Sequence, residues 1–423
     1  MAEGTQSHGF MKDRPLRLTD YSPLRFNEFA LIGAIVTVFL ATLAVDSNHS
    51  YYHEFGYSVT DIVRNTSRLG IVALGAAVVI IAGGIDLSAG SMMAASALVA
   101  ASVLTLCGDE NGKFADAGPV VICCAVGASL LLGLMVGTLH TWLITSIGLP
   151  PFVATLATLV GLRSFSRAVC KYVMFVKTGS ESEQINVVHP FFTYLREHVS
   201  LLVLAFIVLA LFTWFLLART VLGRHTYALG GNEQAARLSG VRTDNVKWFA
   251  YCFSAVAASI AGLFFMADAS VARPSNQAMG YELNAIASAV VGGCSLQGGV
   301  GRVPGVVLGA LFLRVVIDAV SKLIKTGSDV WEGMIVGIVV VLAVTFTQVR
   351  ELMQSGRGFF AGIRGKLAIP TIAVFAALVV MSATTKSPWM REHSFAIGSV
   401  TFALVLVLLI AIERFESFRS VRQ

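Results

Sequence analysis

An aspartate and two serines lie inside one of the most apolar parts of this sequence. The stretch Gly83-Gly84-Ile85-Asp86-Leu87-Ser88-Ala89-Gly90-Ser91 separates an apolar run that begins at Leu69 from another that begins at Met92. An ionised carboxylate at the centre of a lipid bilayer costs roughly 2.5 to 3.5 kcal/mol, so it needs water, a partner or the positive end of a helix. Two roles are therefore open for Asp86: a helix cap, or a direct contact with a polar solute.

The glycine pair predicts a break between two half-spans. If the first half-span ends at Gly83-Gly84 and the second begins near Asp86, backbone amides at the break have no helical partner. The Asp86 carboxylate then accepts hydrogen bonds from these amides and faces the positive end of a helix. Ser88, Gly90 and Ser91 then begin the second half-span.

The same pattern returns as Gly292-Gly293-Cys294-Ser295-Leu296-Gln297-Gly298-Gly299, and both copies read Gly-Gly-x-(Asp or Ser)-Leu-x-x-Gly. A duplicated chain with helices broken at corresponding places is the sequence pattern of a transport pathway near the bilayer midplane. His140 lies within another apolar run, where it bonds neighbouring backbone or lines the pathway. The candidate pathway residues are Gly83, Gly84, Asp86, Ser88, Gly90, Ser91, His140, Gly292, Gly293, Ser295 and Gln297.

Composition places the chain in a membrane, since 56% of its 423 residues are hydrophobic and 13% are charged. The apolar runs are continuous over the ~20 residues that a spanning helix needs, whereas barrel strands alternate apolar with polar residues. The net charge of +6 does not indicate nucleic-acid binding, because the Lys and Arg residues lie between the spans. We therefore predict an all-α polytopic membrane protein.

Twelve apolar windows predict three regions. They fall near 29–45, 67–83, 89–107, 119–147, 152–169, 198–217, 246–268, 281–295, 302–324, 331–348, 368–383 and 395–412. We expect a cytoplasmic tail at 1–28 and a transmembrane core of ten helices at 29–350. A basic cytoplasmic linker and two additional C-terminal helices are expected at 351–423. The first window is predicted to be an uncleaved helix, since no small-residue cleavage site follows it.

The distribution of basic residues predicts the orientation. Lys and Arg gather in the N-terminus, in 218–247, in 348–367 and in the C-terminus. An even number of spans separates these segments, which places all four in the cytoplasm. Five spans then separate the two copies of the glycine motif. The expected core is an inverted five-plus-five repeat, a common basis of alternating access.

The loop 218–247 contains a predicted short helix on the cytoplasmic face. Asn232 is the expected N-cap, Glu233 suits the first turn, and Gly240 is the expected stop. Such a helix is either a lid on this chain or a docking element for another chain, and we favour docking. The candidate docking residues are Gly231, Asn232, Glu233, Ala235, Ala236, Leu238 and Gly240.

Signatures of catalysis are missing from the sequence. The only Gly-Lys pairs are Gly112-Lys113 and Gly365-Lys366, and neither is followed by Ser or Thr, so no phosphate-binding loop is present. The six cysteines lie in or beside apolar runs without metal-ligand spacing. We expect neither an enzyme nor a metal or cofactor on this chain.

Four segments resemble the membrane permease subunits of ribose-type ABC sugar importers. They are Gly83 to Ser91, Pro150 to Leu156, Ala228 to Gly240, and Gly280 to Leu283 followed by Gly292 to Gly299. The resemblance implies a homodimeric or paired permease in the bacterial inner membrane, with both termini cytoplasmic. It also implies a periplasmic sugar-binding protein and a cytoplasmic subunit that holds ATP and Mg. Loop 218–247 would hold the coupling helix, and the solute would be a small sugar or polyol.

The chain departs from that family at three places. His140-Thr141 stands where the family usually has Asn-Gly, Glu282-Leu283-Asn284 stands where it has Glu-Leu-Asp, and 368–423 adds two helices. An ion-coupled secondary transporter is the alternative function. It would need a relay of acidic side chains within the membrane spans, and Asp86 is the only acidic residue that clearly lies within one. A membrane scaffold or receptor that transports nothing is the third hypothesis.

Overall fold

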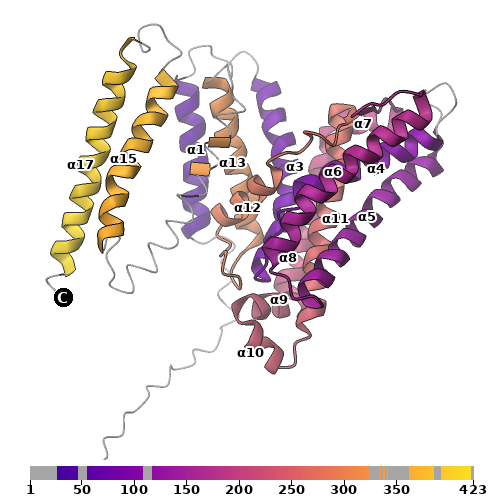
Figure 1. Cartoon of the computed structure of the whole chain (residues 1–423), viewed down its shortest axis with the longest axis horizontal. Helices are drawn as coiled ribbons and strands as arrows, with labels where there is room; N and C mark the ends of the chain where they lie inside the picture. Colours follow the sequence, from indigo (N-terminus) through magenta and orange to yellow (C-terminus); the bar gives the residue numbers. More distant parts are fainter. Residues whose placement is uncertain are drawn as a thin grey trace, which may run out of the picture. The chain divides into compact units, whose positions relative to one another are not determined.

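The computed structural model describes residues 26–45, 55–107, 117–323, 362–384 and 392–420, together with 333–334, 337–338 and 341. It divides into two compact units, Met1–Val340 and Val341–Gln423. In the first unit (Figure 1) the elements are α1 (Phe26–Val45), α3 (Phe55–Ile81), α4 (Ala89–Cys107), α5 (Pro119–Thr145), α6 (Pro151–Thr178), β1 (Ile185–Asn186), α7 (Pro190–Glu197), α8 (Val199–Arg219), α9 (Val221–Gly231), α10 (Glu233–Leu238), α11 (Thr243–Ala269), β2 (Val271–Ala272), α12 (Tyr281–Val291) and α13 (Val303–Leu323). The second unit contains α15 (Gly362–Thr384) and α17 (Ser394–Ser420).

Seven of the described helices are long and apolar enough to cross a membrane. They are α3, α4, α5, α6, α8, α11 and α13. The predicted class, an all-α polytopic membrane protein, is confirmed. The first nine predicted windows of the core coincide with described helices, and the tenth, 331–348, lies outside the described residues apart from 333–334, 337–338 and 341. Helix α3 begins at Phe55, before its predicted window, because polar residues in its first turns lower the local hydropathy.

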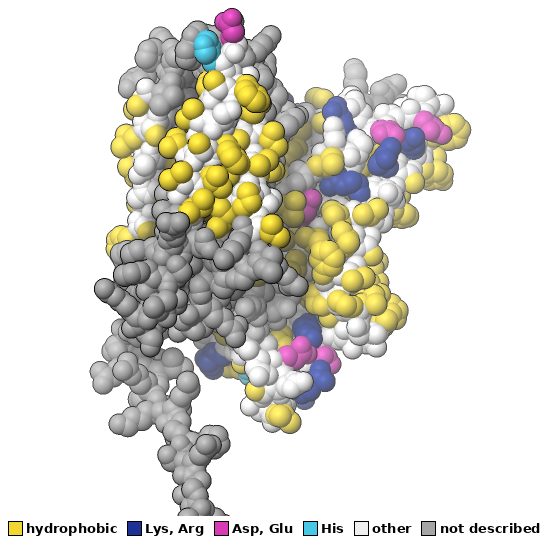
Figure 2. All heavy atoms as spheres, turned by 60° about the vertical axis from the view of Figure 1, so that its left-hand side comes forward, with side chains coloured by type: hydrophobic (Ala, Val, Ile, Leu, Met, Phe, Trp, Pro, Cys, Tyr) yellow, Lys and Arg dark blue, Asp and Glu magenta, His cyan; other side chains and the backbone are white. Residues whose placement is uncertain are grey.

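Three helices form the interior of the first unit. In the most apolar windows of α3, α4 and α11, 89%, 78% and 72% of the residues are buried, against 28%, 17% and 28% in α5, α6 and α8. On the part of the first unit that Figure 2 shows at the right, hydrophobic side chains form a band, and charged side chains lie mainly above and below it. The outer helices therefore present apolar faces suited to lipid or to another membrane subunit.

Small residues allow α11 to pack closely on its neighbours. A Cβ on Gly75 of α3 would lie 2.9 Å from the Cα of Ser254, and one on Gly137 of α5 would lie 2.5 Å from the Cα of Cys252. Gly262 of α11 lies directly against the backbone of Met93 in α4. Such contacts give dense packing between helices in a bilayer, where apolar burial alone favours no particular pair.

The two ends of the first unit differ in structure. At one end, β1 pairs antiparallel with β2, with Ile185 opposite Ala272, and α7 lies nearby; at the other end lie α9 and α10 (Figure 1). Helix α6 has proline in its first turn, and its N-cap is Pro150. Proline loses no helical hydrogen bond at this position, and the start of α6 agrees with the predicted window 152–169.

The second unit is a pair of helices that pack on each other, with Gly398 of α17 against the side chain of Met381 in α15. Pro370 lies inside α15. The basic linker predicted to precede this pair lies largely outside the described residues.

Candidate functional site

The first glycine loop, residues 82–88, joins α3 to α4. Its sharp turn uses Gly83, whose φ of 83° is the left-handed conformation that glycine adopts without strain. The expectation of two half-spans here is wrong, because α3 and α4 are each long enough to cross a membrane. The break lies between two helices instead of within one.

Asp86 is the polar centre of this loop and is 1% exposed. Its Oδ1 accepts hydrogen bonds from the amide and the hydroxyl of Ser88, at 2.9 and 2.6 Å. Its Oδ2 accepts one from the hydroxyl of Ser254 in α11, at 2.7 Å. Three donors around one carboxylate offset the cost of burying it. The bonded amide belongs to the residue just before α4, and Ser254 was not among the predicted residues.

A tyrosine and a histidine extend this polar region. The Tyr251 hydroxyl of α11 lies directly against Gly84, and its ring meets that of His140 edge-on, with centroids 5.9 Å apart. His140 is fully buried. Sequence reasoning missed Tyr251. The available signal was its i, i+3 spacing from Ser254, which puts both polar groups on one face of α11.

The predicted residues in the first turn of α4 face another helix. The Ser91 hydroxyl donates to the Ser88 carbonyl at 2.8 Å, and Gly90 lies directly against the carboxylate of Glu282 in α12. Thr155 of α6 donates to the Ile85 carbonyl at 3.3 Å. The structure therefore brings the start of α4 together with α6 and α12.

The second glycine loop, residues 292–302, follows the 11-residue helix α12. A Cβ on Gly292 would lie directly against the Gly305 backbone, which shows how tightly α12 and α13 pack. The Ser295 hydroxyl accepts from the Gln297 amide at 3.3 Å, and the Gln297 side chain is exposed. Ser295, the counterpart of Asp86, thus stabilises a local turn, whereas Asp86 is also bonded to α11.

The two glycine loops touch each other at the end of α9. The Gly299 amide donates to the Ile81 carbonyl at 2.9 Å, and Gly83 and Gly298 both lie against Gly230. The contacts are not reciprocal, since Gly83 meets Gly298 whereas its counterpart Gly292 meets Gly305. The predicted duplication is visible in the sequence, but these loops do not meet about a local twofold axis.

Helix α10 is capped and stopped as the sequence predicts. The Asn232 side chain accepts from the Ala235 amide at 2.9 Å, and Gly240 follows the helix with a φ of 85°. Its two apolar residues Ala236 and Leu238 do not share one face, since Ala236 is 5% and Leu238 90% exposed. One faces the protein and the other faces away from it.

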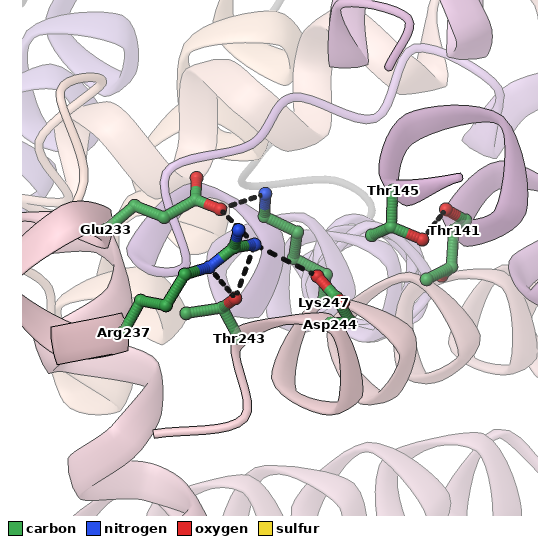
Figure 3. Close-up of polar contacts among 7 residues, drawn as sticks. All are labelled: Thr141, Thr145, Glu233, Arg237, Thr243, Asp244 and Lys247. Atoms are coloured by element: carbon green, nitrogen blue, oxygen red, sulfur yellow. Dashed lines mark hydrogen bonds and ion pairs between the residues drawn. The ribbon is translucent and has the colours of Figure 1, made fainter. Parts of the chain in front are cut away.

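Ion pairs fix α10 to the start of α11 (Figure 3). The Lys247 ammonium lies 2.6 Å from the Glu233 carboxylate, and Arg237 lies 3.5 Å from Asp244 and 3.8 Å from Glu233. Arg237 also donates to the Thr243 hydroxyl at 3.1 Å. The helix is therefore held on this chain and leaves Leu238 available to another. Among the described residues, no group of three or more His, Cys, Asp or Glu could hold a metal ion.

Comparison with known proteins decides the family. The profile of a family described as the permease component of the branched-chain amino acid transport system matches residues 58–344. The chain belongs to this permease family. The matched range runs from the start of α3 past α13, so it contains both glycine loops and α10 and leaves α15 and α17 outside.

Curated relatives are named as permeases, two of the three below as import permeases. This permease is 35% identical over 283 residues to the ribose import permease of Escherichia coli strain K12, covering 67% of this chain and 82% of the relative. It is 34% identical over 322 residues to a probable ABC transporter permease of Sinorhizobium fredii, covering 75% and 88%. It is 27% identical over 319 residues to the galactose/methyl galactoside import permease of E. coli K12, covering 75% and 94%. No solved structure matches it.

These relatives confirm the resemblance to ribose-type permeases. The four segments that carried it lie in the first glycine loop with the start of α4, at the start of α6, across α9 and α10, and around α12 with the second glycine loop. In this permease they converge: Thr155 and Gly299 both bond the backbone of residues 81–85, and Gly230 lies beside them.

Proposed function

We propose that this chain is the membrane-spanning subunit of an ABC importer that moves a small sugar or polyol across the inner membrane. The names of its relatives, ribose and galactose import permeases, support the solute class. ATP and Mg are held by a separate cytoplasmic ATP-binding subunit, and a periplasmic sugar-binding protein delivers the solute. A second permease copy completes the pathway.

The proposed core has ten spans with both termini in the cytoplasm. Support comes from the seven span-length helices, from α1 and α12, and from the apolar window 331–348. Placing α9 and α10 on the cytoplasmic side follows from the basic residues of 218–247. We keep the inverted five-plus-five repeat as part of this proposal, supported by the duplicated glycine motif.

The first glycine loop and its buried neighbours are the proposed pathway lining. Asp86, Ser88 and Ser254 offer polar groups beside the Tyr251 and His140 rings, all in an apolar interior. Hydroxyl, carboxylate and aromatic groups together suit a solute that carries many hydroxyls on a small apolar frame.

The observation that carries the proposed coupling is the exposure of Leu238 on a helix that is otherwise fixed. A leucine 90% exposed at the tip of a capped, ion-paired helix suits insertion into a groove of a partner. Burying a leucine is worth roughly 1.5 to 3 kcal/mol. An ion-coupled secondary transporter would have no need of this contact.

The test is Leu238→Asp. We expect the variant to bind the ATP-binding subunit about ten-fold or more weakly, since 1.4 kcal/mol is a factor of ten, and to lose sugar uptake. Binding-protein association on the outside should persist. Gln234→Asp, an exposed position of the same helix, controls for the added charge. Normal uptake and normal ATPase stimulation by Leu238→Asp would rule out the coupling assignment and favour the secondary transporter.

A further inference from the structure

Glycines from three distant parts of the chain meet backbone to backbone: Gly83, the pair Gly230-Gly231 and the pair Gly298-Gly299. A Cβ on Gly298 would lie 2.9 Å from the Cα of Gly83 and 3.0 Å from the Cα of Gly230. A Cβ on Gly230 would lie 2.5 Å from the Gly299 nitrogen and directly against the Ile81 carbonyl. These approaches are possible only without side chains, so a substitution at Gly230 must separate the three segments.

Hydrogen bonds hold the same junction. The Gly299 amide donates to the Ile81 carbonyl at 2.9 Å, which joins the second glycine loop to the end of α3. The Tyr227 hydroxyl of α9 donates to the Gly301 carbonyl at 2.8 Å, which joins α9 to the same loop. The end of α9 is thus bonded to the loop that also holds α3.

Helix α10 is connected to the first glycine loop by two routes. One runs through Asn232, the single residue between α10 and the glycine junction at the end of α9. The other runs from the Glu233–Lys247 pair into α11, whose Ser254 donates to Asp86. A shift of α10 therefore acts on the proposed pathway from two directions.

We propose that Gly230 is the positioning residue of a backbone junction through which movement of α10 is carried to both glycine loops as one unit. The proposal rests on the proposed function of α10 as the ATPase contact. It assigns a role in the transport cycle to the backbone at the end of α9, in addition to the docking helix that follows it.

The structure supplies a neighbouring control for the junction itself. Gly231 is exposed, and a Cβ built on it has no atom within 4 Å, while neither Gly230 nor Gly231 has a positive φ. Hydrogen exchange of the Gly299 amide, followed by mass spectrometry on the full chain, should rise in Gly230→Ala and stay unchanged in Gly231→Ala. Unchanged protection in Gly230→Ala would refute the junction.

The functional arm uses the reconstituted complex with its binding protein loaded with ribose or galactose, the sugars named for the relatives. The methyl group added in Gly230→Ala overpacks the junction, and we expect it to lower stimulated ATP hydrolysis by roughly ten-fold or more. Binding of the ATP-binding subunit should stay at the wild-type level, a combination that a general folding defect would not give. Gly161→Ala, where a Cβ on α6 also meets open space, should behave as wild type.

Tyr227→Phe keeps the test decisive if Gly230→Ala does not fold. It removes one hydrogen bond without adding an atom, so stimulated hydrolysis should fall by about two- to ten-fold. Wild-type stimulation in both variants would overturn the proposal. If the wild-type chain binds no ATP-binding subunit, the proposed function fails instead, and the exchange of Gly299 still decides whether the junction exists.

Discussion

Asp86 joins the first glycine loop to α11 through a single carboxylate. One oxygen holds Ser88 at the start of α4, and the other holds Ser254. The two roles that the sequence leaves open, cap and solute contact, are compatible with this geometry, because the Ser254 hydroxyl is an exchangeable partner that a solute hydroxyl could replace. The amide of Ser88 is not exchangeable in this way, since it is fixed by the turn.

Substitution of Asp86 separates these contributions. Asn keeps an acceptor for Ser88, and Ser254 can turn its hydroxyl to accept from the new amide, so Asp86→Asn should fold and retain much of the uptake. Leucine leaves the buried donors unpaired, and each unpaired group costs about 1–3 kcal/mol. Asp86→Leu should therefore lower the melting temperature of the purified protein and abolish most uptake. Equal and full uptake by both variants would exclude a structural role for this carboxylate.

At the scale of elements, two sets of ion pairs at the end opposite α10 differ in burial. Asp268 of α11 accepts from Arg64 and Arg68 of α3, each at 2.8 Å, and the Arg68 side chain is 4% exposed and lies over the Phe265 ring. Glu183 pairs with Arg167 at 3.0 Å and with Lys171 at 3.3 Å, and all three are well exposed. The first set joins two of the three interior helices, α3 and α11, and the second lies on the surface.

Removal of Asp268 should therefore destabilise the permease far more than removal of Glu183. Asp268→Asn leaves the buried Arg68 without its counter-charge, which costs about 3 kcal/mol, the lower end of the range for broken buried pairs because Asp268 is 28% exposed. Thermal unfolding in detergent measures this loss, with Glu183→Gln as the exposed control. Equal shifts in the two variants would contradict the conclusion that the Asp268 ion pairs join two interior helices.

The stability that the exposed ion pairs of Glu183 contribute depends on pH, and its direction follows from the pKa of Glu183. Hydrogen bonds from Arg167 and then Lys171 hold the pKa of Glu183 below its usual value. A carboxylate with a depressed folded-state pKa contributes stability above its unfolded pKa and loses it as the pH falls through the folded one. The difference in thermal stability between the wild-type protein and Glu183→Gln should accordingly vanish in acid. Salt should reduce this difference at neutral pH.

At the scale of the whole molecule, the second unit lies outside the range that the family profile matches. The profile ends at residue 344, the compact units divide after Val340, and α15 begins at Gly362. Truncation after Lys366 keeps the basic residues of segment 348–367 and should give a permease that inserts and assembles with its ATP-binding subunit. Gel filtration of the complex in detergent measures assembly, with truncation after Val291, which removes α13, as the negative control. Failure of the Lys366 truncation to assemble would place α15 and α17 in the working core.

Local order along this chain was predictable from the sequence. The membrane class, most helix positions, the proline start of α6, and the cap and stop of α10 follow from hydropathy and from side chains that act within a few residues of themselves. Motif spacing also gave the family, because the four segments resemble its pattern independently of how they pack. The length of α3 was underestimated, since polar residues in its first turns lower the local hydropathy without preventing the helix from forming.

Only the tertiary structure decided which of these segments meet. Ser254 and Tyr251 reach the first glycine loop, and Gly230 and Gly298 meet Gly83, across separations that no local pattern encodes. These contacts depend on close packing of three interior helices, in which a glycine is required wherever backbones approach and a hydroxyl wherever a buried carboxylate needs a donor. The sequence shows where such residues stand, and the packing alone determines which of them become partners.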